Sequence, residues 1–316
     1  MPRLTKDYFL NFYGGEPLLS FDLIQKTVHL LNTKSKAFRK KPHYSLTTNG
    51  SLLSREILQF LNAQRFSVVL SFDGLAQEVH RKKGSLAKTV ARIDEISNYP
   101  NIRLKINSVF TPETTSCLSA SLQWLIHLNC SHIHFSLSTL KPWDEDSIRR
   151  LKKELKKLRK ILLSYYEKKR IMPVVNFREE PLKGFFTCAA GIDRLAITPK
   201  GNIWGCLLFP DYFQGKEKTS EYKKYYFGRL HSFIKKYPQV YPPVQANCER
   251  LSLVNFSTSQ TDCSLCPDME DCRVCPVSAS FSGSPLGKIP DFVCQLQQVL
   301  IKEKKWIRQH LFPSGK

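Results

Sequence analysis

Short runs of β-branched and aromatic residues alternate with stretches of helical periodicity over the first 180 residues of the chain. The runs predict five strands, at Tyr8–Tyr13, His43–Thr48, Ser67–Phe72, Ile102–Phe110 and His132–Leu137. The stretches between them predict helices at Phe21–Asn32, Arg55–Ala63, Leu86–Ser97 and Thr115–Leu128. Strands separated by helices are joined by right-handed crossovers and form a parallel sheet. We therefore expect an α/β fold with a curved sheet, as in a β/α barrel.

A long amphipathic helix is predicted after the fifth strand. Apolar residues recur at three- and four-residue steps from Ile148 to Tyr165, and Asp146 or Ser147 is expected to cap the helix. Its outer face carries eleven Lys or Arg residues, which account for part of the net charge of +21. Such a face is commonly just solvated, although an acidic leader peptide or RNA would also suit it. Because aromatic residues do not interleave with the basic ones, a nucleic-acid partner is not expected.

Composition places most of the cysteines in the second half of the chain. Eight of the ten follow residue 187. No apolar run approaches the roughly 18 residues of a membrane span, and the first eight residues hold no apolar secretion segment. We therefore expect a cytoplasmic protein with no membrane partner. In a reducing compartment, this many cysteines predict metal or redox chemistry instead of a disulfide framework.

Glycines and small polar residues follow three consecutive predicted strands. The segments are GGEP at residues 14–17, TTNG at 47–50 and SFDG at 71–74, and Asn107 lies in the fourth strand. Asn-Gly and Asp-Gly are ordinary turn sequences when they occur singly. Here they recur at the carboxyl ends of strands, where β/α barrels place their chemistry. Gly14 and Gly15 would let the backbone approach a ligand closely.

The cysteines of the second half follow a regular spacing. Cys188 is followed after twelve residues by Gly201 and after four more by Cys206, around a hairpin expected to turn at residues 199–201. Then come Cys248, a C-x2-C-x5-C-x2-C run at residues 263–275, and Cys294 in a closing helix predicted at Phe292–Leu311. Soft thiolates in this number suit iron–sulfur clusters. Structural zinc sites also use C-x2-C pairs, but usually with a spacer of about 15–20 residues.

These motifs resemble those of radical S-adenosylmethionine (SAM) enzymes that carry a C-terminal auxiliary-cluster domain called SPASM. The resemblance extends from Tyr8 to the closing helix. It implies a partial (β/α)6 radical SAM (TIM-like) barrel in residues 1–180 and a small cysteine-rich α+β SPASM domain in residues 181–316. It also implies that the methionine amino group is held by Gly14, Gly15 and Glu16. The ribose and adenine would be contacted by Ser71, Asp73 and Asn107.

The same resemblance implies two auxiliary [4Fe–4S] clusters. The outer cluster would be held by Cys263, Cys266, Cys272 and Cys294. The inner cluster would be held by Cys188, Cys206 and Cys275, with Cys248 as a candidate fourth ligand. The family pattern has C-x3-C where this chain has the shorter Cys272-x2-Cys275. Cys117 and Cys130 lack spaced partners and are expected to be small buried hydrophobes.

The resemblance is incomplete at the cluster that cleaves SAM. The family holds that cluster with a C-x3-C-x2-C loop after the first barrel strand, and the sequence contains no such run. We therefore expect the first strand, its loop and its helix to be missing from the barrel, and SAM to bind weakly if at all. A shortened product of a longer gene and a relic without its radical source remain alternative explanations.

The resemblance implies an enzyme that modifies a peptide or protein, as anaerobic sulfatase-maturing enzymes and maturases of ribosomally made peptides do, with flavodoxin or ferredoxin as a reductant. Sulfatase-maturing members have an aspartate directly after the cysteine of the G-x4-C segment. This chain has Leu207 there, which favours another peptide. One alternative is a non-catalytic iron–sulfur protein for electron transfer or peptide docking; another is a zinc-bound nucleic-acid-binding protein. His132 and His134 are expected to be structural.

Overall fold

The computed structural model describes residues 7–38, 40–80, 84–178 and 184–311, and these form two compact units. Unit 1 comprises Met1–Ser138, Arg149–Arg178 and Ile307–Lys316. Unit 2 comprises Thr139–Ile148 and Glu179–Trp306. The expected division after residue 180 lies close to one observed boundary, whereas residues 139–148 and 307–316 each group with the other half of the chain.

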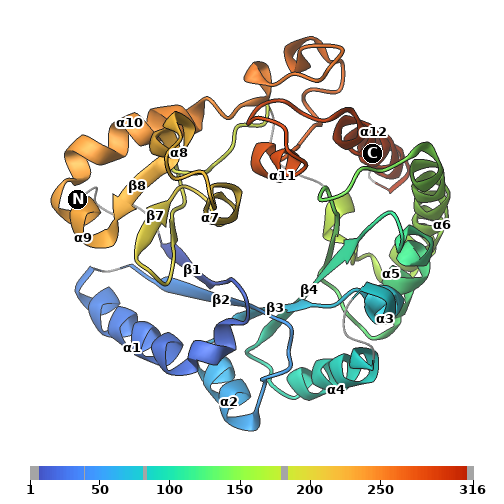
Figure 1. The fold of residues 1–316 in the computed structure, drawn as a ribbon. Helices are drawn as coiled ribbons and strands as arrows, with labels where there is room; N and C mark the ends of the chain where they lie inside the picture. Colours follow the sequence, from blue (N-terminus) through green and yellow to red (C-terminus); the bar gives the residue numbers. More distant parts are fainter. Residues whose placement is uncertain (1–6, 39, 81–83, 179–183, 312–316) are drawn as a thin grey trace. The chain divides into compact units, whose positions relative to one another are not determined.

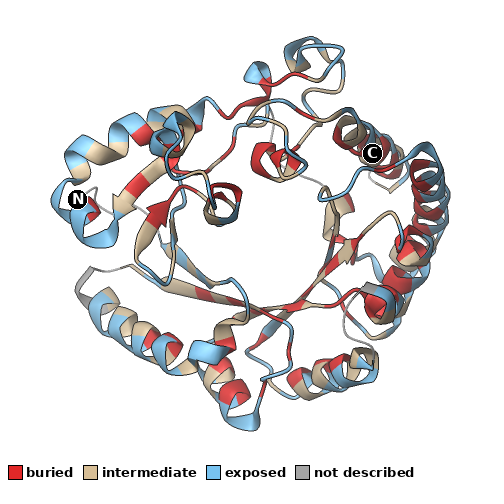
Figure 2. Cartoon of the chain, in the orientation of Figure 1, coloured by how far each residue is buried: buried red, intermediate tan, exposed pale blue. Residues whose placement is uncertain are grey.

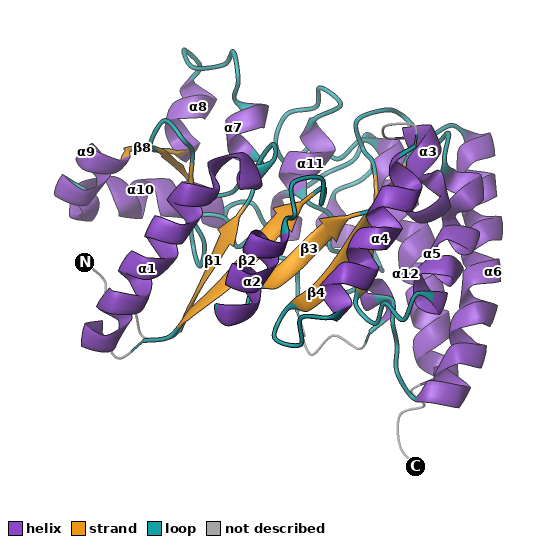
Figure 3. Ribbon diagram, turned by 90° about the horizontal axis from the view of Figure 1, so that it is seen from below, coloured by secondary structure: helices purple, strands orange, loops and turns teal. Residues whose placement is uncertain are grey.

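Unit 1 is built on a five-stranded parallel sheet whose strands pair in chain order. The strands are β1 (Tyr8–Phe12), β2 (Pro42–Thr48), β3 (Ser67–Ser71), β4 (Arg103–Phe110) and β5 (Ile133–Leu137). They follow a curve in Figure 1, and Figure 3 shows the labelled arrowheads pointing toward the same edge. The predicted α/β fold with a parallel sheet is confirmed, and each predicted strand is present with its ends shifted by at most one residue. Val174 adds a single parallel bridge to Ile133 beyond β5.

The helices of unit 1 lie on the convex side of this sheet (Figures 1 and 3). They are α1 (Phe21–Phe38), α2 (Arg55–Ala63), α4 (Ser85–Ser97) and α5 (Leu118–His127), with a short α3 (Gln77–His80) and the 3-10 turns η1 (Pro17–Ser20), η2 (Gly74–Ala76), η3 (Thr115–Cys117) and η4 (Val175–Phe177). Alternate strand residues such as Leu46, Val68 and Ile106 are buried on the side facing them. The residues between these, such as Ser71 and Asn107, stay partly exposed on the opposite face.

The predicted amphipathic helix is α6 (Glu145–Lys169), and its apolar stripe is buried. The expected cap was wrong: the Ser147 amide donates to Asp144 Oδ1 at 2.7 Å, so Asp144 caps the helix. On the buried side, Glu154 accepts hydrogen bonds from Ser119 and Lys157. Burial raises the pKa of this carboxyl, but the hydrogen bonds outweigh burial and lower it. Among the described helices, none combines the length and the apolar character needed to cross a membrane.

Unit 2 centres on a three-stranded antiparallel sheet of β6 (Ala196–Ile197), β7 (Asn202–Trp204) and β8 (Tyr226–Arg229). The hairpin of β6 and β7 was predicted, as was α12 (Asp291–Leu311). Rings of Phe213, Tyr222 and Tyr226 surround Trp204 with centroids 5.0–5.4 Å away. Figure 2 shows buried segments in β7, α7 and α11. The remaining elements are α7 (Phe209–Tyr212), α8 (Ser220–Tyr225), α9 (Leu230–Lys235), α10 (Tyr237–Glu249), α11 (Pro276–Ser280), η5 (Leu253–Asn255) and η6 (Cys263–Leu265).

Candidate functional site

The glycine turn after β1 has a backbone that only glycine adopts readily. Gly14 has φ +106° and Gly15 has φ +52°. A Cβ at either position would meet no atom within 4 Å. Conformation, and not close packing, therefore requires glycine at both positions, and the space in front of the turn is free for a ligand.

Glu16 fastens this turn to the end of β2. Its Oε1 accepts a hydrogen bond from Thr48 Oγ1 at 2.8 Å and its Oε2 accepts one from the Asn49 amide at 2.9 Å. The Leu18 amide also donates to Oε1, so the carboxylate caps η1. Two motifs that lie more than 30 residues apart in the sequence are thus joined through one side chain at the carboxyl edge of the sheet.

Glu16→Gln is expected to lower the free energy of unfolding by about 1–2 kcal/mol, because the amide nitrogen cannot accept the hydrogen bond that one carboxylate oxygen accepts. Urea unfolding followed by circular dichroism measures the change. The control is Glu56→Gln, which removes an exposed carboxylate in the first turn of α2. Surface changes of this kind usually stay within about 0.5 kcal/mol. Equal losses in the two variants would contradict the bridging role of Glu16.

Three polar residues form a row across the neighbouring strands β3, β4 and β5. Ser71 on β3 is in register with Asn107 on β4, which is in register with His134 on β5. His134 Nδ1 and Asn107 Oδ1 lie 3.0 Å apart at hydrogen-bonding distance. The structure thus brings Ser71 and Asn107 together and adds His134, a residue for which the sequence indicated only a structural role. The feature that could have identified His134 is the strand register, because it places His134 beside Asn107.

Asp73 takes a different position from the other residues expected to bind SAM. It is fully buried, and its Oδ1 accepts a hydrogen bond from the Val109 amide at 2.8 Å. Its own amide donates to Gln77 Oε1 at 3.1 Å. In this structure the carboxylate joins the loop after β3 to strand β4. A contact between Asp73 and a ribose remains a prediction, and it would require this buried side chain to become accessible.

His132 lies directly before β5, two residues from His134, and contacts Arg178. Its Nδ1 lies 3.3 Å from Nη1 of Arg178, whose Nη2 donates to the carbonyl of Ser131. Burial lowers the pKa of His132 to about 4, and the charges of Arg178, Lys105 and His134 contribute in the same direction. The neutral imidazole is therefore the form that fits beside the guanidinium.

Because the folded state disfavours the protonated ring of His132, the unfolded chain binds this proton more tightly. The stability contributed by His132 is complete above its ordinary pKa of about 6.5 and is lost as the pH falls toward 4. Urea midpoints measured between pH 7 and pH 4 are expected to decline less steeply in His132→Asn than in the unmodified protein. A variant at the exposed His127, His127→Asn, serves as the control and should leave the slope unchanged. An identical slope in His132→Asn would contradict this reading.

Four cysteines of unit 2 interact as one group, termed here the inner set: Cys188, Cys206, Cys248 and Cys275. Burial raises the pKa of Cys188 to about 11, and Cys275 and Cys206 raise it further. Burial likewise raises the pKa of Cys248 to about 12, with additional contributions from Cys188 and Cys206. The set combines cysteines that are up to 87 residues apart in sequence.

The remaining four form a second group, the outer set: Cys263, Cys266, Cys272 and Cys294. Burial raises the pKa of Cys263 to about 11, and Cys272, Cys294 and Cys266 add to the increase. Burial also raises the pKa of Cys272 to about 11, with contributions from Cys294 and Cys266. These are the ligand sets expected from the sequence, and their role as cluster ligands stays a prediction.

Within the described residues, no three His, Cys, Asp or Glu side chains form a group that could hold a metal ion. A [4Fe–4S] cluster makes a different demand, because each of its four cysteines binds a different iron and the sulfurs need not meet around one point. Two sets of four soft sulfur donors therefore fit two such clusters in number and in chemistry.

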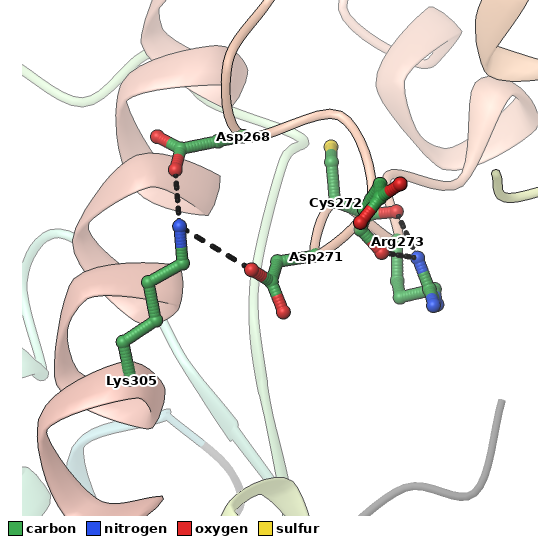
Figure 4. Close-up of polar contacts among 6 residues, drawn as sticks. Asp268, Asp271, Cys272, Arg273 and Lys305 are labelled. Carbon is green, nitrogen blue, oxygen red and sulfur yellow. Dashed lines mark hydrogen bonds and ion pairs between the residues drawn. The ribbon is translucent and has the colours of Figure 1, made fainter. Parts of the chain in front are cut away.

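An ion pair holds the cysteine loop of the outer set against α12 (Figure 4). Lys305 Nζ donates to Asp268 Oδ1 at 2.7 Å and lies 3.3 Å from Asp271 Oδ2. The hydrogen bond that Lys305 donates to Asp268 is the main cause of the raised pKa of Lys305. Asp268 and Asp271 lie between Cys266 and Cys272, while Cys294 is on α12 itself. The pair thus links the two segments that supply the outer set.

The two cysteines of unit 1 stand apart from these sets. Cys130 is buried, as expected, and burial raises its pKa to about 11. Cys117 is only partly buried, so the expectation of a buried small hydrophobe was wrong for this residue. It lies at the start of α5, where the preceding 3-10 turn brings it to the surface.

Comparison of the sequence with known proteins finds two relatives, and no family model matches the chain. The radical SAM cyclopropyl synthase TigE of Paramaledivibacter caminithermalis is 25% identical over 221 residues, covering 66% of this chain and 46% of that protein. An uncharacterized protein of Methanocaldococcus jannaschii is 27% identical over 215 residues, covering 63% of this chain and 71% of that protein. The chain thus corresponds to about half the length of TigE.

Solved structures share the fold over nearly the whole chain. Native anSMEcpe with bound AdoMet and Cp18Cys peptide superimposes with a TM-score of 0.74 at 17% identity, covering 97% of this chain and 87% of that one. Streptococcus suis SuiB bound to precursor peptide SuiA gives a TM-score of 0.55 at 15% identity, covering 90% and 65%. Both solved structures are below 25% identical to this chain and show a shared fold, while TigE shows a similarity in sequence.

Proposed function

We propose that the protein is a radical SAM protein of the SPASM type that acts on a peptide. The proposal is carried by eight cysteines between residues 188 and 294, in a spacing close to the SPASM pattern, together with the sequence similarity to the radical SAM protein TigE. The peptides bound to anSMEcpe and SuiB support a peptide as the substrate class. The fold and the strand-end motifs support the SAM component.

In this proposal the carboxyl edge of the unit 1 sheet binds SAM. The Gly14–Gly15 turn offers unhindered backbone groups to the methionine moiety, and Glu16 keeps the turn in place. Ser71 and Asn107 offer a hydroxyl and an amide to the ribose and adenine, and His134 orients the Asn107 side chain through their hydrogen bond. Asp73 holds the loop after β3 against β4 by accepting a hydrogen bond from the Val109 amide.

In unit 2 the outer set of Cys263, Cys266, Cys272 and Cys294 would hold one [4Fe–4S] cluster. Cys188, Cys206 and Cys275 of the inner set would hold the other. Such clusters supply one-electron transfer when bound. The protein orients the thiols and excludes water, most strongly around Cys248 and Cys188, which are 0% and 9% exposed. A flavodoxin or ferredoxin would serve as the reductant.

A second candidate is an iron–sulfur protein that transfers electrons or docks peptides without cleaving SAM. The observation in its favour is that the 316 residues contain no C-x3-C-x2-C run. Both candidates predict two clusters in unit 2. They differ in whether SAM binding and cleavage accompany the clusters.

The test is anaerobic reconstitution with iron and sulfide, followed by assays of iron, sulfide and zinc and by calorimetric titration with SAM. About eight irons per chain and SAM binding that is weak, because the C-x3-C-x2-C ligands are not in this sequence, and that Gly15→Val reduces further support the radical SAM proposal. Iron without SAM binding would select the second candidate. Colourless protein with stoichiometric zinc would reject both and favour a zinc-bound nucleic-acid protein.

A further inference from the structure

Lys105 is a partly exposed lysine on the concave face of the unit 1 sheet. It alternates along β4 with Ile106, which is buried on the convex side. The Ile106 amide donates to the His132 carbonyl at 2.9 Å. Because β4 and β5 are parallel, extending their register by one residue places Lys105 beside His132. Among the described residues, no carboxylate pairs with Lys105, and none of the strand residues on its face is Asp or Glu.

Arg178 follows a segment that lies along β5 on the side away from β4. Its Nε donates to the Met172 carbonyl at 2.8 Å, and its Nη2 donates to the Ser131 carbonyl. These two bonds fix the guanidinium beside His132, whose Nδ1 lies 3.3 Å from Nη1. Both bonds go to uncharged carbonyl oxygens, so they leave the positive charge of Arg178 without neutralisation.

The imidazole of His132 adds a third hydrogen-bond donor. A guanidinium only donates hydrogen bonds, so Nδ1 of His132 accepts from Arg178 and the neutral ring carries its proton on Nε2. Within the described part of the chain, no atom accepts a hydrogen bond from this Nε2. The pKa of His132 is lowered by burial and then by Arg178, Lys105 and His134, which are all basic side chains. The residues that the structure describes thus gather donors and positive charge here without a counter-anion.

We propose that Lys105, His132 and Arg178 bind a carboxylate of the peptide substrate, either an Asp or Glu side chain or the C-terminal carboxylate. This rests on the proposed function, which supplies a peptide as the ligand. Lys105 precedes Asn107 by two residues along β4, so the site lies about 7 Å nearer the amino-terminal edge of the sheet than the row of Ser71 and Asn107. It is thus apart from the glycine turn that would hold the methionine moiety.

A carboxylate matches this site in charge and in hydrogen bonding. Its two oxygens accept several hydrogen bonds, and bonds from charged donors are the stronger ones. An amide of the same shape would leave both cations unpaired, so the site is expected to prefer an acid over its amide. A bound carboxylate would also raise the pKa of His132, since an opposite charge favours the protonated ring.

The test uses the full chain after the anaerobic reconstitution described above, with histidine labelled with carbon-13, and follows the His132 ring signals by nuclear magnetic resonance. His132→Asn identifies these signals. N-acetyl-glutamic acid α-amide, which carries a side-chain carboxylate, is expected to shift them in a saturable manner. N-acetylglycine carries only a C-terminal carboxylate, and the tighter of these two probes identifies the source of the carboxylate. The neutral N-acetyl-glutamine α-amide should leave the signals unchanged.

Lys105→Gln is expected to weaken binding of the carboxylate probe about tenfold, because it removes one charged partner. Lys105→Arg keeps the charge and should retain most of the affinity. Lys88→Gln, at an exposed position of α4, is the matched control and should bind as the unmodified chain does. Circular dichroism verifies that each variant is folded.

Equal responses to the acid and amide probes, or an unchanged affinity in a folded Lys105→Gln variant, would overturn the inference and leave the proposed function to its iron and SAM assays. Inorganic phosphate that binds more tightly than both carboxylates would overturn the assignment to a peptide carboxylate. A chain that takes up no iron but binds the carboxylate probes through Lys105 would overturn the proposed function while supporting this site.

Discussion

Replacing Cys263 and Cys266 by alanine is expected to halve the iron and sulfide bound after anaerobic reconstitution, from about eight to about four of each per chain. The two thiols belong to the outer set, in which burial raises the pKa values of Cys263 and Cys272 and the Cys266 thiol adds to both increases. Removing two of four ligands should therefore empty one cluster and leave the other. Iron and sulfide assays, with the absorbance near 400 nm as an independent measure, record the result.

The matched control for this experiment is Cys117→Ala combined with Cys130→Ala, which also removes two thiols but none from unit 2. This pair is expected to retain the full iron content, since neither cysteine lies in a thiol set. A loss of all iron in the Cys263 and Cys266 variant would contradict two independent clusters. Retention of all iron would exclude these residues as ligands.

Gly74→Ala is expected to destabilise the chain by on the order of 3 kcal/mol, through backbone strain of about 1–2 kcal/mol and overpacking of about 1–3 kcal/mol. Gly74 has φ +62°, and a Cβ there would lie 2.7 Å from Ser121 Cβ and 3.1 Å from the Ser121 carbonyl oxygen. Ser121 belongs to α5, so the clash is with the backbone of a buried helix that cannot rotate away. Urea unfolding followed by circular dichroism measures the loss.

Gly84→Ala separates strain from packing. Gly84 has a similar φ of +78°, but a Cβ there would meet no atom within 4 Å. This variant is therefore expected to cost only about 1 kcal/mol. If the two variants lost the same stability, the contact between Gly74 and α5 would not be a packing constraint.

The outcome at Gly74 bears on how the SFDG segment is understood. The resemblance to radical SAM enzymes implied that Ser71 and Asp73 of this segment contact the cofactor. In the structure Gly74 and Asp73 are both buried, and they connect β3 to α5 and to β4 respectively. Ser71 is the residue of this segment that reaches the polar row. A functional motif at a strand end can thus combine one residue that faces a ligand with neighbours that hold the edge together.

The chain's own residue pattern determined the order and type of the elements in unit 1. Apolar and polar residues alternate along β2 to β5, and apolar residues recur at three- and four-residue steps along α6. These patterns indicate which face of each element is buried, and they can be read from neighbouring residues in the sequence. The hairpin of β6 and β7 was readable for the same reason, since its turn and flanking residues are adjacent in sequence. The short helices α7 to α10 gave no such signal. Rings of α7 and α8 pack on Trp204, whereas rings of α9 and α10 pack on Phe227. Pro242 and Pro243 lie inside α10.

Cysteine spacing, through its resemblance to the SPASM pattern, indicated two sets of soft donors, because ligand type and interval are properties of the sequence. Only the tertiary structure decided that Cys248 packs against Gly191, that His134 pairs with Asn107, and that Asp73 is buried. Each of these depends on contacts between segments at least 27 residues apart. Such contacts are fixed by strand register and by the close approach of backbones at glycine, neither of which a linear pattern of polar and apolar residues encodes.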